Sequence, residues 1–219
     1  MVQEARPGES GVATDNPTSQ TLDGPIAPLA TCGTVSHLEA REAVKTLLRF
    51  IGDDPERDGL LDTPRRVVDA LREMTAGLRD DPSEYLGVIF NGATDEMVVL
   101  RNIRFTSVCE HHLLPFVGFV DVGYIPEDGI VGISKLARVV HCFARRPQVQ
   151  ERLTSDIADA IQEYLKPKGV GVRIRAHHHC MGCRGVRLHE AEMITSDVRG
   201  VFRTKPEARA EFFDLVRSQ

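Results

Sequence analysis

The 219-residue sequence has no tryptophan, no long apolar run and no excess of basic residues. A membrane-spanning helix needs about 20 consecutive, mostly apolar residues, and no stretch approaches that length. The net charge of -5 argues against general nucleic-acid binding, which normally requires a basic face. The first residues, MVQEARPG, lack the apolar segment of a secretory signal. We therefore expect a cytoplasmic protein that binds neither membrane nor nucleic acid and meets any polyanion through a local basic patch.

Cysteine is also scarce, and its count of 5 is odd. One residue, Cys32, stands alone near the N-terminus, whereas Cys109, Cys142, Cys180 and Cys183 fall within one region. An odd count without a secretory signal does not suit a disulfide framework. The cysteines therefore indicate a reduced protein that uses thiols to bind metal.

Residues 1–35 are rich in Gly, Pro, Ser, Thr and Ala and show no hydrophobic periodicity, which is typical of a flexible tail. From Ser36 apolar residues recur at three- and four-residue steps, which predicts a helix that ends at Gly52. Thr63 is the expected N-cap of a second helix, with Pro64 in its first turn. Residues 36–95 should therefore form an N-terminal helical region with a structural role.

The remaining residues, 96–219, are expected to form a second domain, in which two hairpins enclose a helix pair. The predicted elements are strands 97–105 and 117–125, a helix from Ser134 as N-cap, a helix at 148–165 opened by Pro147, strands 170–174 and 186–198, and a helix at 204–217. Phe212 and Leu215 should face inward in the last helix. This pattern predicts an α+β fold whose first hairpin turns at Cys109.

The segment from Cys109 to His112 has the Cys-x2-His spacing that lets one turn offer sulfur and nitrogen to one ion. A second Cys- and His-rich cluster, residues 177–183, also follows a predicted strand. Two such clusters predict a metal site, with zinc the expected ion.

The residues allow two versions of this site. Cys109, His112, Cys180 and Cys183 could form a closed structural site, or the first three could form an open site. We favour the open set, because it gives His111 and His178 a use as general acid and base.

The predicted helix start at Ser134 favours anion binding. Lys135 and Arg138 share a face there, beside backbone N–H groups at the positive end of the helix dipole. In the next helix, Glu151 is either a favourable first-turn charge or, with Gln150, a partner for the N–H edge of guanine. The spacing leaves these two interpretations open.

Five segments together give a resemblance to a known family, the GTP cyclohydrolases I, from about residue 36 to the end. They are DGLLDTP at 58–64, CEHHLLPF at 109–116, GISKLAR at 132–138, FARRPQVQERLT at 143–154 and HHCMGCRGV at 178–186. The resemblance implies zinc on Cys109, His112 and Cys180, with His111 and His178 in proton transfer. The same resemblance implies contacts to the substrate by further residues. Those for the triphosphate are Ser134, Lys135, Arg138 and Arg184, and those for guanine are Gln150 and Glu151.

The implied reaction is hydrolysis of the GTP imidazole ring at C8, loss of formate and rearrangement to 7,8-dihydroneopterin triphosphate, the first step of tetrahydrofolate biosynthesis. The implied architecture is the tunnelling fold, assembled as a decamer of two stacked pentamers with sites between subunits. The alternatives are a catalytically silent, zinc-stabilised GTP-binding regulator and another tunnelling-fold enzyme.

The sequence departs from the family pattern at three places. His179 offers a second register for the acid–base histidine, although the His-x-Cys spacing selects His178. Cys183 adds a thiol, which we expect to be a bystander because strand residues three apart point to opposite faces. Ala191 and Met193 stand where the family commonly has Ser-x-Thr.

Overall fold

The computed structural model describes residues 34–87, 89–90 and 94–217. The expected tail lies almost wholly outside these residues, as does Cys32. The described chain is built on a five-stranded sheet in the order β5-β2-β3-β6-β7, where β5 is the short edge strand Pro147–Gln148. The two hairpins are β2 (Val98–Cys109) with β3 (Pro115–Ile125), and β6 (Gly169–His178) with β7 (Glu192–Gly200). Between them lie α4 (Ile133–Ala144) and α5 (Gln150–Leu165), as expected for the tunnelling fold.

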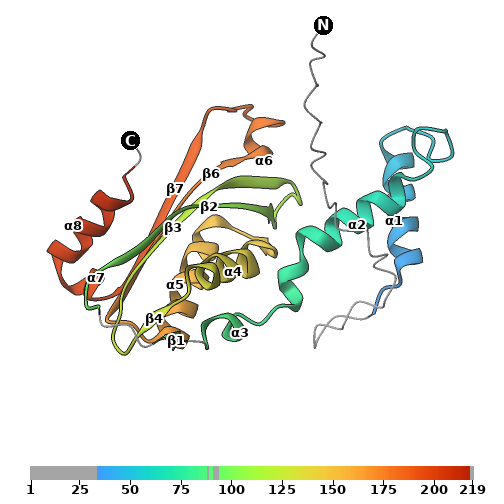
Figure 1. The fold of residues 1–219 in the computed structure, drawn as a ribbon. Coiled ribbons are helices and arrows are strands. Elements are labelled where there is room, and N and C mark those ends of the chain that lie inside the picture. The colour runs from blue at the N-terminus through green and yellow to red at the C-terminus, as the bar shows by residue number, and fades with distance from the viewer. Residues whose placement is uncertain (1–33, 88, 91–93, 218–219) are drawn as a thin grey trace, which may run out of the picture.

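Helices α4 and α5 cover one face of the sheet (Figure 1). The stripe predicted for the second helix is buried, since Leu153, Ile157 and Ile161 are fully inaccessible to solvent. They pack with strand residues such as Val120 and Ile174 in one core. Fully burying such a side chain stabilises the fold by about 1.5–3 kcal/mol, so this helix pair holds the sheet in shape.

The C-terminal helix α8 (Pro206–Leu215) follows the short α7 (Val201–Thr204). It packs against the end of the hairpins that is far from the Cys109 turn. The Phe212 ring lies over Gly123 and Gly171, where an added Cβ would come within 2.7 Å and 2.8 Å of the ring. These glycines therefore give the aromatic ring its place on the sheet.

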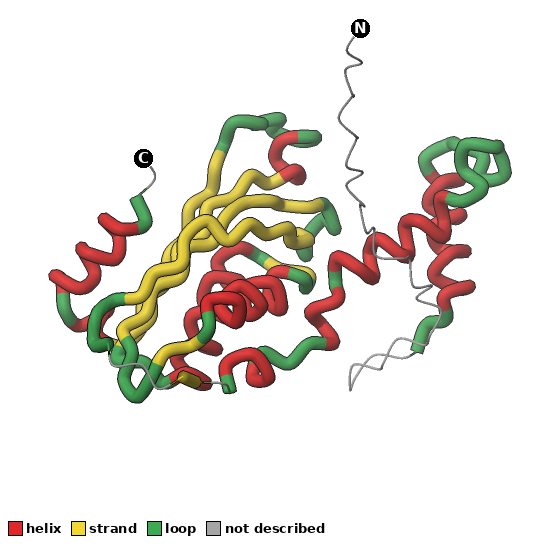
Figure 2. The backbone as a smooth tube through the Cα atoms, in the orientation of Figure 1, coloured by secondary structure: helices red, strands yellow, loops and turns green. Residues whose placement is uncertain are grey.

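The N-terminal helices α1 (His37–Phe50) and α2 (Thr63–Met74) form an arm that extends away from the sheet (Figures 1 and 2). Ser36 caps α1 in a capping box with Glu39, which confirms the predicted helix start. The short η1 (Ala76–Arg79) and α3 (Ser83–Leu86) connect the arm to α4. Gly77 of η1 connects this segment to the end of α4, because its N–H donates a hydrogen bond to the Arg145 carbonyl at 2.9 Å.

A small second sheet lies beside the start of α4. Its strands are β1 (Ile89–Phe90) and β4 (Ile130–Val131). The Val131 N–H donates to the Tyr124 hydroxyl at 3.1 Å. This bond ties the start of α4 to the end of the first hairpin that is opposite the Cys109 turn.

Two predicted helix caps were wrong by one or two positions. Asp62, not Thr63, is the N-cap of α2. Gly132, not Ser134, precedes α4, because the Lys135 N–H already closes a turn onto the Gly132 carbonyl at 2.8 Å. Ser134 therefore lies within the first helical turn.

The prediction that a helix begins at Pro147 and Gln148 was also wrong. These residues form β5, which pairs in parallel with Val108 and Cys109. The extended backbone of Val149 then caps α5 at Gln150. A contact with β2, distant in the sequence, replaces the first helical turn.

Near the C-terminus, β7 begins at Glu192 rather than at Val186. Gly185 and Arg187 have φ angles of 61° and 54°, a left-handed conformation that interrupts an extended strand.

The predicted inward position of Leu215 in the last helix was wrong, since it is 44% exposed. Val216, four residues after Phe212, is buried instead.

None of the helices within the described ranges is long and apolar enough to cross a membrane.

Candidate metal centre

The turn between β2 and β3 carries Cys109 and His112. Backbone bonds tighten this turn, since the Leu113 N–H donates to the Cys109 carbonyl at 2.8 Å and the Cys109 N–H to the Leu114 carbonyl at 2.9 Å. Leu113 has a left-handed φ of 53°. The Glu110 N–H donates to the Gln148 carbonyl at 3.0 Å, so β5 holds the turn from outside.

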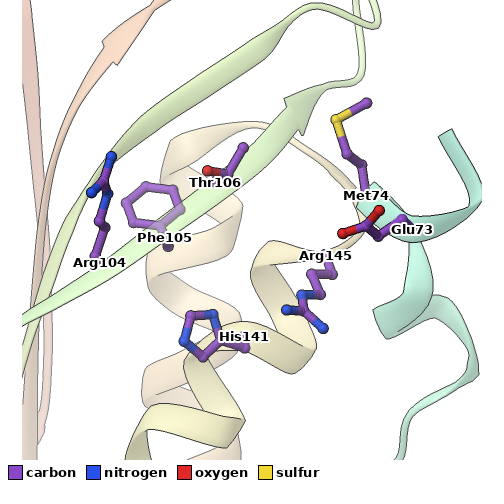
Figure 3. Close-up of a pocket in the computed structure, with 7 residues that line it drawn as sticks. All are labelled: Glu73, Met74, Arg104, Phe105, Thr106, His141 and Arg145. Carbon is purple, nitrogen blue, oxygen red and sulfur yellow. The ribbon is translucent and has the colours of Figure 1, made fainter. Parts of the chain in front are cut away.

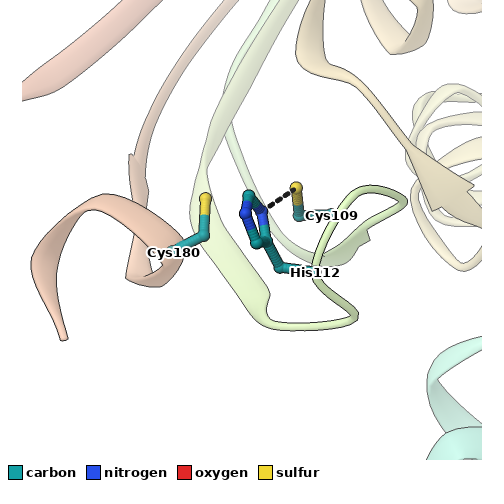
Figure 4. Close-up of side chains that lie close together, drawn as sticks. All are labelled: Cys109, His112 and Cys180. Carbon is teal, nitrogen blue, oxygen red and sulfur yellow. Dashed lines mark hydrogen bonds between the residues drawn. The ribbon is translucent and has the colours of Figure 1, made fainter. Parts of the chain in front are cut away.

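Cys180 reaches the same place from the second hairpin. β6 ends at His178, whose strand partner is Phe116 at the start of β3. One short helix, α6 (His179–Gly182), then carries Cys180 towards the turn (Figure 4). The ligand atoms of Cys109, His112 and Cys180 all lie within 4.8 Å of one another. The structure thus brings together the three predicted metal ligands.

The chemistry of these three residues suits a metal cation. The Cys109 Sγ lies 3.8 Å from the His112 Nδ1. Burial raises the pKa of the Cys180 thiol, and the neighbouring Cys109 raises it further. A divalent cation relieves this cost because it pairs with both thiolates. Two sulfurs and an imidazole nitrogen are donor types that zinc takes, so the residues fit that ion.

Cys183 is not a member of this cluster. It is exposed and follows α6, with its N–H bonded to the His179 carbonyl at 2.9 Å. Cys183 was expected to stay outside the site because it would lie on a strand. It instead follows the helical turn of α6, and this turn places its thiol outside the cluster. The closed set of four side chains is therefore not formed by the described residues.

His178 lies beside the cluster and is half-buried. Its ring stacks on Phe116 with 4.5 Å between centroids, and its Nε2 lies 2.9 Å from the Gln150 Oε1. Burial lowers the pKa of His178, and the Glu151 carboxylate partly opposes that shift. The imidazole is therefore neutral at neutral pH and can accept a proton.

The other two candidate histidines are exposed. The His111 Nδ1 lies 4.0 Å from the Cys109 Sγ, so His111 borders the cluster. The His179 Nδ1 instead lies 3.1 Å from the Pro115 carbonyl oxygen. Because this contact ties its ring to the backbone, His178 is the better placed of the adjacent pair.

Of the predicted triphosphate contacts, only Arg184 lies at the metal cluster, with its Nη1 3.1 Å from the His112 Nε2. Ser134, Lys135 and Arg138 lie at the start of α4. Two residues beyond its far end, the Arg146 carbonyl accepts a hydrogen bond from the Ser107 hydroxyl, close to Cys109. A 12-residue helix is about 18 Å long. Within one chain, the two groups are therefore apart.

The two predicted guanine contacts differ in exposure. Glu151 is exposed in the first turn of α5, whereas Gln150 is only 1% exposed. The side chain of Gln150 bonds within the protein, to residues of β6 and β7.

Sequence reasoning missed the hydrogen-bonded side chains that support the turn between β2 and β3. Arg152 donates hydrogen bonds to the Glu110 carboxylate and, at 3.0 Å, to the Gln148 Oε1. The Gln148 amide also donates to Asp156 at 3.1 Å. The bond with Arg152 lowers the pKa of Glu110. Glu110 and Arg152 are 42 positions apart, and no local pattern signals their pairing.

A separate cavity of about 420 Å³ lies between α2, β2 and α4 (Figure 3). Its lining residues are Glu73, Met74, Arg104, Phe105, Thr106, His141 and Arg145. None of the candidate metal ligands or acid–base residues is among them, so this cavity does not define the site.

Comparison with known proteins supports the resemblance seen in the motifs. The sequence model of the family described as GTP cyclohydrolase I matches residues 40–217. GTP cyclohydrolase 1 of Wolinella succinogenes is 52% identical over 177 residues, 80% of this chain and 95% of the relative. The enzyme of Carboxydothermus hydrogenoformans is 53% identical over 178 residues, covering 81% and 93%. That of Thermobifida fusca is 50% identical over 192 residues, covering 87% and 92%. Because the family model covers most of the chain and these relatives are about half identical to it, the chain belongs to the GTP cyclohydrolase I family.

Proposed function

We propose that this chain is a zinc-dependent GTP cyclohydrolase I. It hydrolyses the imidazole ring of GTP at C8, releases formate and forms 7,8-dihydroneopterin triphosphate, the first step of tetrahydrofolate and pterin biosynthesis. The observation that carries the proposal is the cluster of Cys109, His112 and Cys180 beside His178. A cytoplasmic location suits it, because a reducing compartment keeps both thiols free for metal.

Zinc would be held by Cys109, His112 and Cys180, the three donors that the fold brings together. Bound by three side chains, zinc supplies Lewis acidity towards water at neutral pH. The chain's own groups then handle the protons. His178, half-buried and neutral, accepts or returns a proton at the reacting purine, and exposed His111 exchanges protons with solvent.

The substrate contacts require more than one copy of the chain. Arg184 and Glu151 serve the site of their own subunit, while Ser134, Lys135 and Arg138 bind the triphosphate in a neighbour's site. This division follows from the length of α4, which separates the basic helix start from the cluster. The retained triphosphate then positions the base, so that its binding energy contributes to catalysis.

The proposed assembly is a homodecamer of two stacked pentamers. Two features of the described chain support an oligomer. β7 forms one edge of the sheet, while β2 pairs with β5 only at Val108 and Cys109, so long strand edges are open to other copies. Phe50 and Ile51 on the arm are 84% and 71% exposed, as in a surface that another subunit covers. We assign residues 36–95 to an N-terminal helical region, which includes the arm, and residues 96–219 to the catalytic domain.

The test is to incubate the purified, zinc-loaded protein with GTP and to measure formate and the pterin that fluoresces after oxidation. We expect stoichiometric release of both. Tight GTP binding without formate release would identify a silent regulatory protein, and absence of both binding and turnover would reject the family activity for this chain.

A further inference from the structure

We infer that the Gln150 side chain is a positioning residue that holds the ring and tautomer of His178, and not a contact for guanine. The inference deepens the proposed function and rests on it. Gln150 is the first residue of α5, and its 1% exposure leaves its side chain no surface for a ligand.

The neighbours of the Gln150 amide determine its orientation. The Nε2 lies 2.9 Å from the Met193 carbonyl oxygen and 3.3 Å from the Ile174 carbonyl oxygen. Because a carbonyl oxygen only accepts hydrogen bonds, the NH2 group must face these two atoms. A reversed amide would place the Oε1 against two other oxygens in a buried site, which is strongly unfavourable.

Two threonines reinforce this orientation. The Thr195 hydroxyl lies 3.1 Å from the Gln150 Nε2 and 2.7 Å from the Thr154 hydroxyl. Thr154 donates to the Gln150 carbonyl at 2.7 Å, so its oxygen is free to accept from Thr195. Thr195 can then accept one amide N–H and the Met193 carbonyl the other, so both N–H groups of the Gln150 amide have an acceptor.

The remaining amide atom selects the tautomer of His178. The Gln150 Oε1, an acceptor, lies 2.9 Å from the His178 Nε2, so that nitrogen carries the hydrogen. Proton exchange at His178 therefore takes place at Nδ1. An amide oxygen accepts the Nε2–H whether or not Nδ1 is protonated. Gln150 can thus hold the ring through a full cycle of proton transfer.

Kinetics of Gln150→Met separate positioning from base recognition. Methionine is similar in size but makes none of the amide's hydrogen bonds. We expect kcat for formate release to fall about 10- to 100-fold, the range for loss of a residue that orients a metal-ligating histidine. The Kd for GTP should stay within about threefold, because a positioning role adds nothing to ground-state binding. A tenfold or larger rise in Kd with little change in kcat would overturn the inference.

A matched control is available on the same helix. Gln162→Met makes the same change at a partly buried glutamine, whose amide donates to the Pro167 carbonyl at 3.2 Å. We expect its kcat and Kd to equal those of the parent protein. Zinc content and thermal unfolding of both variants show whether either change acts through folding.

A spectroscopic test needs no turnover. In ¹⁵N-histidine-labelled, zinc-loaded protein, the signals of His178 are those that disappear in His178→Ala. We expect a protonated Nε2 and an unprotonated Nδ1 in the neutral ring of the parent protein. The opposite tautomer would overturn the inference even if Gln150→Met failed to fold. Absence of formate release by the parent protein would instead count against the proposed function alone.

Discussion

The imidazole of His178 lies parallel to the ring of Phe116, with 4° between the planes and 4.5 Å between the centroids. The two residues are register partners on β6 and β3, and Phe116 is fully buried. A buried aromatic ring thus supports one face of the proposed acid–base residue, while Gln150 holds one edge.

We expect Phe116→Leu to reduce kcat about tenfold or more, because a loosely held imidazole loses alignment with the reacting atoms. The cost in stability should be about 1–2 kcal/mol, because the smaller leucine leaves a small cavity in the core. Phe202→Leu, at another fully buried phenylalanine, is the control. It should cost similar stability in denaturant unfolding and leave kcat unchanged, and equal losses of kcat in both variants would reject the role of the stacking.

The metal ligands are tested by two cysteines three positions apart. We expect Cys180→Ala to lose zinc, because two donors remain in the cluster, whereas Cys183→Ala should keep it. Elemental analysis of the purified proteins measures the zinc content per chain. Full zinc occupancy in Cys180→Ala would bring Cys183 into the ligand set.

The adjacent histidines offer a similar pair. His178→Ala should retain zinc and lose about 10²- to 10⁴-fold in kcat, the range for removal of a general acid or base. His179→Ala should retain both zinc and turnover, because its ring contacts the Pro115 carbonyl. A larger loss of formate release in His179→Ala than in His178→Ala would reverse the assignment.

Acid stability should depend on Asp197, which joins β7 to α5. Burial alone would raise its pKa, but hydrogen bonds from Arg199 and Ser155 outweigh burial and lower it. The carboxylate therefore stabilises the fold above the ordinary aspartate pKa of about 4. That stabilisation is lost as the pH falls through the lowered pKa.

We expect Asp197→Asn to destabilise the protein by about 1–2 kcal/mol at pH 7, with the difference from the parent shrinking below about pH 4. Denaturant unfolding over this pH range provides the measurement. Asp159→Asn is the control, since Asp159 is 62% exposed and pairs only with Arg199 among the described residues. A pH-independent difference for Asp197→Asn would show that the effect is not ionic.

Much of the fold could be read from local patterns. The stripe Leu153, Ile157 and Ile161 marked the buried face of α5, and alternation marked the core strands, because burial repeats with the period of each element. The elements that were misplaced depend on distant partners. Pro147 and Gln148 form a strand only because the end of β2 lies beside them.

The sequence by itself determined the chemistry available to this protein, because short motifs contain the thiols, the imidazoles and the basic residues at the start of α4. Tertiary structure decided which of these groups meet. It joined Cys109 and His112 to Cys180, left Cys183 outside, enclosed Gln150 against His178 and put Ser134 about a helix length away. The reason is physical: a ligand set or a hydrogen bond depends on strand register between segments far apart in the chain, and local periodicity carries no information about that register.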